Sequence, residues 1–175
     1  GYNQNGINDL LVLETPAEFN FKIGRHNARV FGDFAYNFSG NSRARVGAAA
    51  TAPAGGLPYA VTGQNKAYQV GFGFGNLGLV YGQTSKKNTW EARVYWQHVE
   101  QYAADVNLLD SDFFEGRANL EGVYAAFAYS FTDAIIATVR YGHAQPINNS
   151  LGTGGNNPDL PILNPVKDYD LVQLD

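Results

Sequence analysis

The chain has 175 residues, of which 16% are charged and 14% are aromatic, and its net charge is −4. A chain this acidic lacks the basic surface of nucleic-acid binding domains, so nucleic acid is not an expected partner. The 20 glycines, 11 tyrosines and 11 phenylalanines favour β structure over a helical bundle. No apolar run approaches the roughly 20 residues that a transmembrane helix needs.

Alternating apolar and polar residues predict β-strands, and almost no helical periodicity is found. In "TWEARVYWQ", for example, Trp90, Val94 and Trp96 alternate with Glu91 and Arg93. The predicted strands are, in chain order, 18–23, 29–38, 67–75, 89–97, 122–131, 134–142 and 169–175. The stretch "DLLVLETP" near the start is a candidate for an eighth strand.

Residues 73–78, "GFGNLG", match the G-x-G-x-x-G pattern of dinucleotide-binding loops. That chemistry needs the glycines to lie between a strand and a helix. Here β-type residues continue on both sides. The pattern therefore favours a bulge near Asn76, or close packing within a sheet, over a nucleotide site.

The expected connections alternate between short and long. "GRHN", "SKKN" and "TD" are short, whereas 39–66, 103–118 and 145–167 are long. An up-and-down barrel in an outer membrane sorts its connections in this way, with tight turns at one end and long loops at the other. A soluble β-sandwich has no reason to do so.

Strand alternation alone leaves both folds open, because the apolar side chains meet either a protein core or lipid. The loop lengths favour lipid. Seven strands leave two open edges, which lipid does not tolerate. We therefore predict an all-β, antiparallel up-and-down transmembrane β-barrel, in which residues 1–175 form a single segment of about seven or eight strands of a larger barrel.

In such a barrel the polar side chains of each strand face water, and the apolar side chains, which alternate with them, face lipid. Charged residues lining a pore select ions through their local field, although the same residues can simply be paired wall residues. The pore-lining candidates are Arg29, Asp33, Asn37, Gln69, Glu91, Arg93, Tyr95, Gln97, Thr138, Arg140, Gln173 and Asp175. The lipid-facing candidates are Val30, Phe34, Tyr36, Phe72, Trp90, Val94, Trp96, Phe127, Tyr129 and Val139.

The long loops carry charged residues that are candidates for a constriction or for a divalent cation, which prefers carboxylate oxygens. A plain solvated loop is the alternative for all of them. They are Arg43, Arg45, Asp105, Asp110, Asp112 and Glu115.

The sequence gives little sign of metal or catalytic chemistry. His98 and Glu100 share a face of their strand, but two ligands make a weak metal site. No G-x-S-x-G elbow is present. We therefore expect no metal, no cofactor and no enzymatic activity.

Several stretches resemble the putative porin family of Gram-negative outer membranes. These are "WEARVYWQHVE", "LLDSDFFEGRANLEG", "VYAAFAYSFTDAIIATVRYG" and the closing "YDLVQLD", and "RVFGDFAYNF" and "AYQVGFGFG" are similar more loosely. Family members usually carry a basic residue where this chain has Leu171, and they continue beyond Asp175 to a terminal aromatic residue. The resemblance implies the C-terminal part of an outer-membrane barrel, without the end of its last strand.

The same resemblance implies passage of small hydrophilic solutes or ions across an outer membrane, with membrane lipid and those solutes as partners. Such barrels commonly form homo-trimers, although no residue here indicates one. A soluble β-sandwich binding module and a structural barrel within an envelope assembly are the alternative interpretations.

Overall fold

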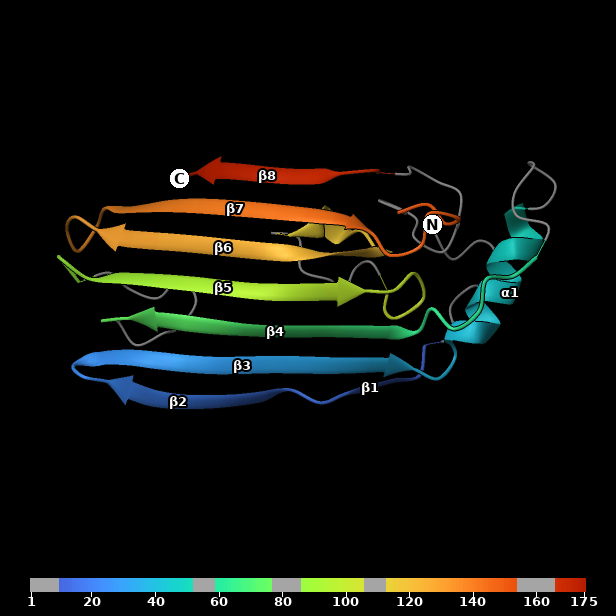
Figure 1. Ribbon diagram of the computed structural model, residues 1–175, viewed down its shortest axis with the longest axis horizontal. Helices are drawn as coiled ribbons and strands as arrows, with labels where there is room; N and C mark the ends of the chain where they lie inside the picture. The colour runs from blue at the N-terminus through green and yellow to red at the C-terminus, as the bar shows by residue number, and fades with distance from the viewer. Residues whose placement is uncertain (1–9, 52–58, 77–85, 106–112, 154–165) are drawn as a thin grey trace.

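The computed structural model describes residues 10–51, 59–76, 86–105, 113–153 and 166–175 (Figure 1). Eight strands form one antiparallel sheet in the order β1-β3-β4-β5-β6-β7-β8, with β2 also paired to β3. The elements are β1 (Val12–Glu14), β2 (Ala17–Ile23), β3 (His26–Asn37), α1 (Gly40–Thr51), β4 (Lys66–Gly75), β5 (Trp90–Val99), the short 3₁₀ helix η4 (Phe114–Gly116), β6 (Leu120–Ser130), β7 (Ile136–Pro146) and β8 (Tyr169–Leu174).

The predicted all-β antiparallel fold is confirmed. Consecutive strands pair along the chain from β3 to β8, as an up-and-down arrangement requires. The described strands form one sheet rather than the two packed sheets of a sandwich. Within the described residues the sheet is not closed, as expected for part of a barrel.

The candidate eighth strand near the start does not add a new neighbour to the sheet. β1 and β2 both pair with β3, in a single continuous register. Between them the Thr15 backbone N–H still donates to the Phe34 carbonyl at 2.8 Å, whereas Pro16 has no N–H to donate. "DLLVLETP" therefore extends the first strand of the sheet past a proline.

Helix α1 and the described ends of the long connections after β3, β5 and β7 lie at one end of the sheet, opposite the tight turns β2–β3 and β6–β7 (Figure 1). This agrees with the predicted sorting of loops. The prediction for one short connection was wrong. β4 ends at Gly75 and β5 begins at Trp90, so the connection between them is longer than the turn predicted at 85–88. Residues 77–85, including Gly78 and the far side of the bulge predicted at Asn76, lie outside the described part.

Helix α1 was not predicted from the sequence. Its alanine-rich residues, "GNSRARVGAAAT", have high intrinsic helix propensity. They lack an apolar stripe at helical spacing, which is the pattern that identifies most surface helices. In the described part of the chain, no helix is both long enough and apolar enough to cross a membrane.

The strand register sorts the side chains onto two faces. Val30 of β3 lies opposite Phe72 of β4, which lies opposite Val94 of β5, and all three point to what we call the apolar face. On the other side, which we call the polar face, Gln69 of β4 pairs with Asp33 of β3 and with Gln97 of β5. The parity predicted from the sequence therefore runs unbroken across these strands.

Candidate functional site

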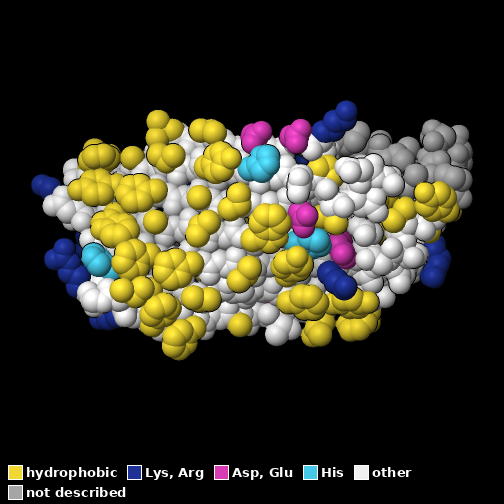
Figure 2. Space-filling model, viewed as in Figure 1, with side chains coloured by type: hydrophobic (Ala, Val, Ile, Leu, Met, Phe, Trp, Pro, Cys, Tyr) yellow, Lys and Arg dark blue, Asp and Glu magenta, His cyan; other side chains and the backbone are white. Residues whose placement is uncertain are grey.

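The apolar face exposes many large hydrophobic side chains. Phe127 is 46% exposed, Val139 48% and Val94 43%. Figure 2 shows these side chains spread over several neighbouring strands. By strand register, this face holds all the lipid-facing candidates: Val30, Phe34, Tyr36, Phe72, Trp90, Val94, Trp96, Phe127, Tyr129 and Val139. An apolar patch of this extent marks a surface that something other than water covers.

Aromatic side chains border this face at the end with the tight turns. The ring of Trp90 lies 5.5 Å from His26, 5.6 Å from Phe74 and 6.3 Å from Phe127. Tyr129, opposite Trp90 in β6, belongs to the same row. Amphipathic rings at one edge of an apolar band are typical of the boundary between lipid and water.

Two histidine–carboxylate pairs lie on this face toward the other end of β5 and β7 (Figure 2). His98 Nδ1 lies 2.8 Å from Glu121 Oε2, and His143 Nδ1 lies 2.9 Å from Asp170 Oδ1. At about 3.4 Å per residue, the span from Trp90 to His98 is about 27 Å long. Since barrel strands tilt by about 40°, a strand of this length rises about 21 Å along the membrane normal, which covers most of an apolar band about 25 Å tall.

On the polar face, most charged candidates have a partner. Arg29 Nη2 lies 2.8 Å from Glu18 Oε2, and Arg140 Nη1 lies 2.5 Å from Asp175 Oδ2. Gln173, the other candidate on β8, donates to Asp175 at 2.8 Å. These contacts fit paired wall residues, the second of the two interpretations that the sequence left open.

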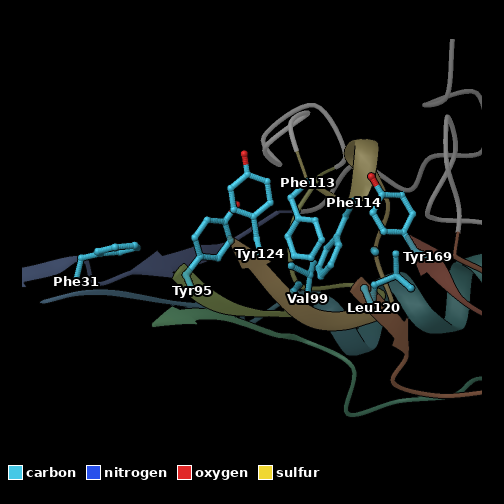
Figure 3. Close-up of a cluster of buried hydrophobic side chains, with 11 residues drawn as sticks. Phe31, Tyr95, Val99, Phe113, Phe114, Leu120, Tyr124 and Tyr169 are labelled. Atoms are coloured by element: carbon cyan, nitrogen blue, oxygen red, sulfur yellow. The ribbon is translucent and has the colours of Figure 1, made fainter. Parts of the chain in front are cut away.

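Part of the long connection between β5 and β6 folds back onto the polar face. Phe113 and Phe114 are almost completely buried there. The Phe113 ring lies 5.4 Å from Tyr124, 5.9 Å from Tyr169 and 6.0 Å from Tyr95. Figure 3 shows these rings together above one face of the sheet. We call the area under residues 113–118 the covered half of the polar face.

Glycine makes room for this covering segment. A Cβ at Gly142 of β7 would lie 2.7 Å from Phe113 Cε2, closer than real Cβ contacts. A side chain there would therefore lift Phe113 from the sheet. Arg93 of β5 adds to the packing, with its guanidinium 5.2 Å from the centre of the Tyr124 ring. Tyr95 and Arg93 were predicted to line a pore, and both lie at this covered region.

Asn119 fixes the covering segment in place. Its φ of +59° turns the chain from the segment into β6. Its Nδ2 donates to the Asn148 carbonyl at 2.9 Å and to the Gly152 carbonyl at 3.2 Å, and its Oδ1 accepts from the Asn148 N–H at 2.9 Å. The connections β5–β6 and β7–β8 are thus joined through one buried side chain.

The remainder of the polar face, over β1, β3, β4 and part of β5, holds a cavity of about 280 Å³. Glu14, Asp33, Gln69 and Gln97 are its polar lining residues. A second hollow of about 420 Å³ adjoins it and shares Asp33 and Gln69. We call this area the cavity half of the polar face. Glu14 was missed in the sequence because "DLLVLETP" was only a candidate for an eighth strand, and none of its side chains was assigned to a face.

The other predicted site residues lie apart from both halves or are held in loop contacts. Asn37 is fully buried, and its Oδ1 accepts the backbone N–H groups of Leu11 and Ser39. On α1, Arg43 is buried and Arg45 is exposed. The loop candidates Asp110 and Asp112 lie outside the described residues, and Asp105 and Glu115 flank them. Glu91 and Thr138 are half-buried on the polar face.

The sequence was compared with models of known protein families. The sequence model of the putative porin family matches residues 10–161. The chain belongs to this family. No curated protein and no solved structure matches it.

Membership of the putative porin family supports a porin-like role in general and an outer-membrane setting. Among the described residues, no group of three or more His, Asp or Glu side chains is arranged to hold a metal ion. His98, the candidate ligand, contacts Glu121 and lies 3.7 Å from Glu100.

Proposed function

We propose that this protein lets small hydrophilic solutes diffuse passively across the outer membrane of a Gram-negative bacterium. The main support is the division of a single sheet into two faces of opposite character. One face presents exposed apolar side chains across neighbouring strands, with aromatic rings at one end and histidine–carboxylate pairs toward the other. The other carries charged and amide side chains around hollows.

In this proposal the described strands are part of the wall of a larger barrel. Lipid covers the apolar face, and the polar face lines the pore. The covering segment at residues 113–118 occupies space on the pore side and narrows it. Solutes are then selected by size where the segment projects, and by charge where the wall carries carboxylates and arginines.

The first test is electrical. The full-length protein, purified in detergent, is added to a planar lipid bilayer, and current is recorded in salt solutions. Stepwise current that scales with salt concentration is the expected result. A protein that inserts and passes no current would overturn the channel and support a structural barrel. A protein that stays in solution without detergent would overturn the membrane assignment altogether.

Two neighbouring positions test the orientation of the faces. Phe127 is 46% exposed on the apolar face, whereas the next residue, Ala128, lies on the polar face opposite Glu91. An arginine at a lipid-facing site near the middle of the membrane destabilises a barrel by about 2–4 kcal/mol. Phe127→Arg should show this loss of unfolding free energy in lipid vesicles, and Ala128→Arg should show little. The reverse order would invert the assignment.

A further inference from the structure

The cavity half has a row of polar side chains running across three strands. Asp33 of β3, Gln69 of β4 and Gln97 of β5 are direct partners in the strand register, so their side chains follow one another along the sheet. Glu14 joins them from β1, where it lies opposite Ala35 of β3. All four line the same cavity of about 280 Å³.

Two side chains in this row have polar atoms without a hydrogen-bond partner among the residues that the structure describes. Asp33 Oδ1 is buried and has no hydrogen bond. Gln97 is only 6% exposed, and its side chain makes no hydrogen bond with any other residue that the structure describes. Buried polar groups are normally hydrogen-bonded, and leaving them without a partner is costly. The row is therefore suited to a bound molecule that supplies those hydrogen bonds.

The charge of the cavity selects the kind of molecule. Glu14 and Asp33 bring two carboxylates to one wall, and two neighbouring carboxylates repel each other unless a proton or a cation lies between them. Arg29, at the adjoining hollow, is paired with Glu18 at 2.8 Å. Among the described residues that line the cavity itself, none is a lysine or an arginine. Its field therefore attracts cations and repels anions.

We propose that this cavity binds protonated primary amines that also carry hydroxyl groups, as a subsite for solutes on their way through the pore. The proposal rests on the porin function above and names the class of solute that the pore favours. An ammonium group has three donors and no acceptor, which matches the carboxylates of Asp33 and Glu14. The hydroxyl groups of the solute exchange hydrogen bonds with the amides of Gln69 and Gln97. A cavity of this volume is near the lower end of the range for small-molecule sites, so a single sugar-sized amine fits.

The test compares two solutes that differ mainly in charge. Glucosamine carries an ammonium group at neutral pH, and N-acetylglucosamine is its uncharged acetylated form. Each is titrated into a bilayer containing the full-length protein, and the concentration that halves the potassium current is measured. A charge-assisted hydrogen bond that the neutral sugar lacks predicts roughly ten-fold stronger block by glucosamine.

Variants assign that preference to the cavity. The double variant Glu14→Gln, Asp33→Asn keeps the size of both side chains and removes their charge, so the two sugars should then block about equally. Asp170→Asn removes a carboxylate from the apolar face, where it contacts His143, and should keep the preference. Equal block by both sugars in the unmodified protein would overturn the proposal, as would a preference that survives in the double variant.

A silent bilayer would contradict the proposed channel but not the cavity. In that case, glucosamine binding to the detergent-solubilised protein is measured by titration calorimetry. Binding of glucosamine that the double variant loses would keep the amine site and reject the pore. Binding too weak to detect, or binding that the double variant retains, would reject the amine site.

Discussion

The two halves of the polar face have the same strand pattern and different contents. In the covered half, Phe113 from a long connection packs among tyrosines and excludes water from the face. In the cavity half, carboxylates and amides surround a hollow that none of the residues of η4 reaches. In the covered half, stability depends on buried apolar area. In the cavity half, the buried polar groups add little to stability and are available to a solute.

This difference shows that strand alternation predicts which side chains share a face of the sheet, but not which other segment or molecule packs on that face. Both halves alternate correctly, and in both the outward parity is apolar. The two halves differ in whether a loop that is distant in the sequence packs over the strands. Gly142 provides that space in β7, whereas Asp33, Gln69 and Gln97 present polar side chains in the other half.

The largest effect is expected from emptying the covered half. Phe113→Ala removes a fully buried ring that contacts Tyr95, Tyr124 and Tyr169. Such truncations cost about 3–5 kcal/mol of unfolding free energy. Denaturant titration of the full-length protein in lipid vesicles measures this loss. Because the covering segment is then held less firmly over the polar face, the single-channel current should also rise.

Phe131→Ala is the matched control for that prediction. Phe131 is 54% exposed beside the β6–β7 turn and lies outside the covered half. Its loss should change the unfolding free energy by less than about 1 kcal/mol and leave the current unaltered. If both alanine variants behaved alike, the covering segment would have no special role in stability or in the pore.

A smaller effect is expected from releasing the covering segment at its end. Asn119→Ala removes the hydrogen bonds to the β7–β8 connection and places an alanine at a φ of +59°. We expect a loss of about 2–3 kcal/mol, because both the hydrogen bonds and the left-handed backbone are affected. Denaturant titration measures it, and the current should rise as for Phe113→Ala.

Asn119→Gly separates the two causes. Glycine adopts positive φ without strain, so this variant loses only the side-chain hydrogen bonds. It should therefore be more stable than Asn119→Ala, while both remain less stable than the unmodified protein. An alanine variant as stable as the glycine variant would show that the backbone angle contributes nothing.

The smallest effect is expected at Glu100, which lies just beyond β5 where the chain leaves the sheet for the covering segment. Glu100 Oε2 accepts the backbone N–H of Lys66 at 2.7 Å, at the start of β4. Burial raises the pKa of this carboxyl, but the nearby His98 imidazole, 3.7 Å away, and the hydrogen bond from the Lys66 backbone N–H lower the pKa by more, so its net pKa lies below the ordinary value.

A carboxyl with a lowered folded-state pKa adds stability above its unfolded pKa of about 4.3 and loses that contribution as the pH falls through the folded value. Glu100→Gln should therefore reduce the unfolding free energy at pH 7 by at most about 1 kcal/mol, since the pair is partly solvated. Towards pH 3 the two proteins should converge. A deficit that stays constant with pH would assign the effect to packing.

Much of the sheet was predictable because it depends on local alternation. Trp90, Val94 and Trp96 alternate with Glu91 and Arg93, and the structure keeps that parity across the neighbouring strands. The extension of the first strand past Pro16, and helix α1, were not predicted. Neither feature is marked by the local sequence pattern, because a proline interrupts the first strand and no apolar stripe identifies the helix.

The candidate site was predictable only in part. Asp33, Gln69 and Gln97 were identified by parity, but parity does not reveal that they lie side by side in one cavity, nor that Glu14 joins them. The sequence offered the aspartates of the β5–β6 connection as candidates for a constriction or a cation site, with a plain solvated loop as the alternative. In the described part of that connection, Phe113 and Phe114 are the residues that insert.

The sequence by itself determined the antiparallel β fold, the division into an apolar and a polar parity, and the resemblance to the family, because each of these depends on spacing along one strand or on short motifs. Only the tertiary structure decided which residues meet across strands, and which part of the polar face is covered. Those contacts join positions far apart in the chain, such as Phe113 with Tyr169 and Asn119 with Gly152. They depend on strand register and on space left by individual side chains, which no local pattern encodes.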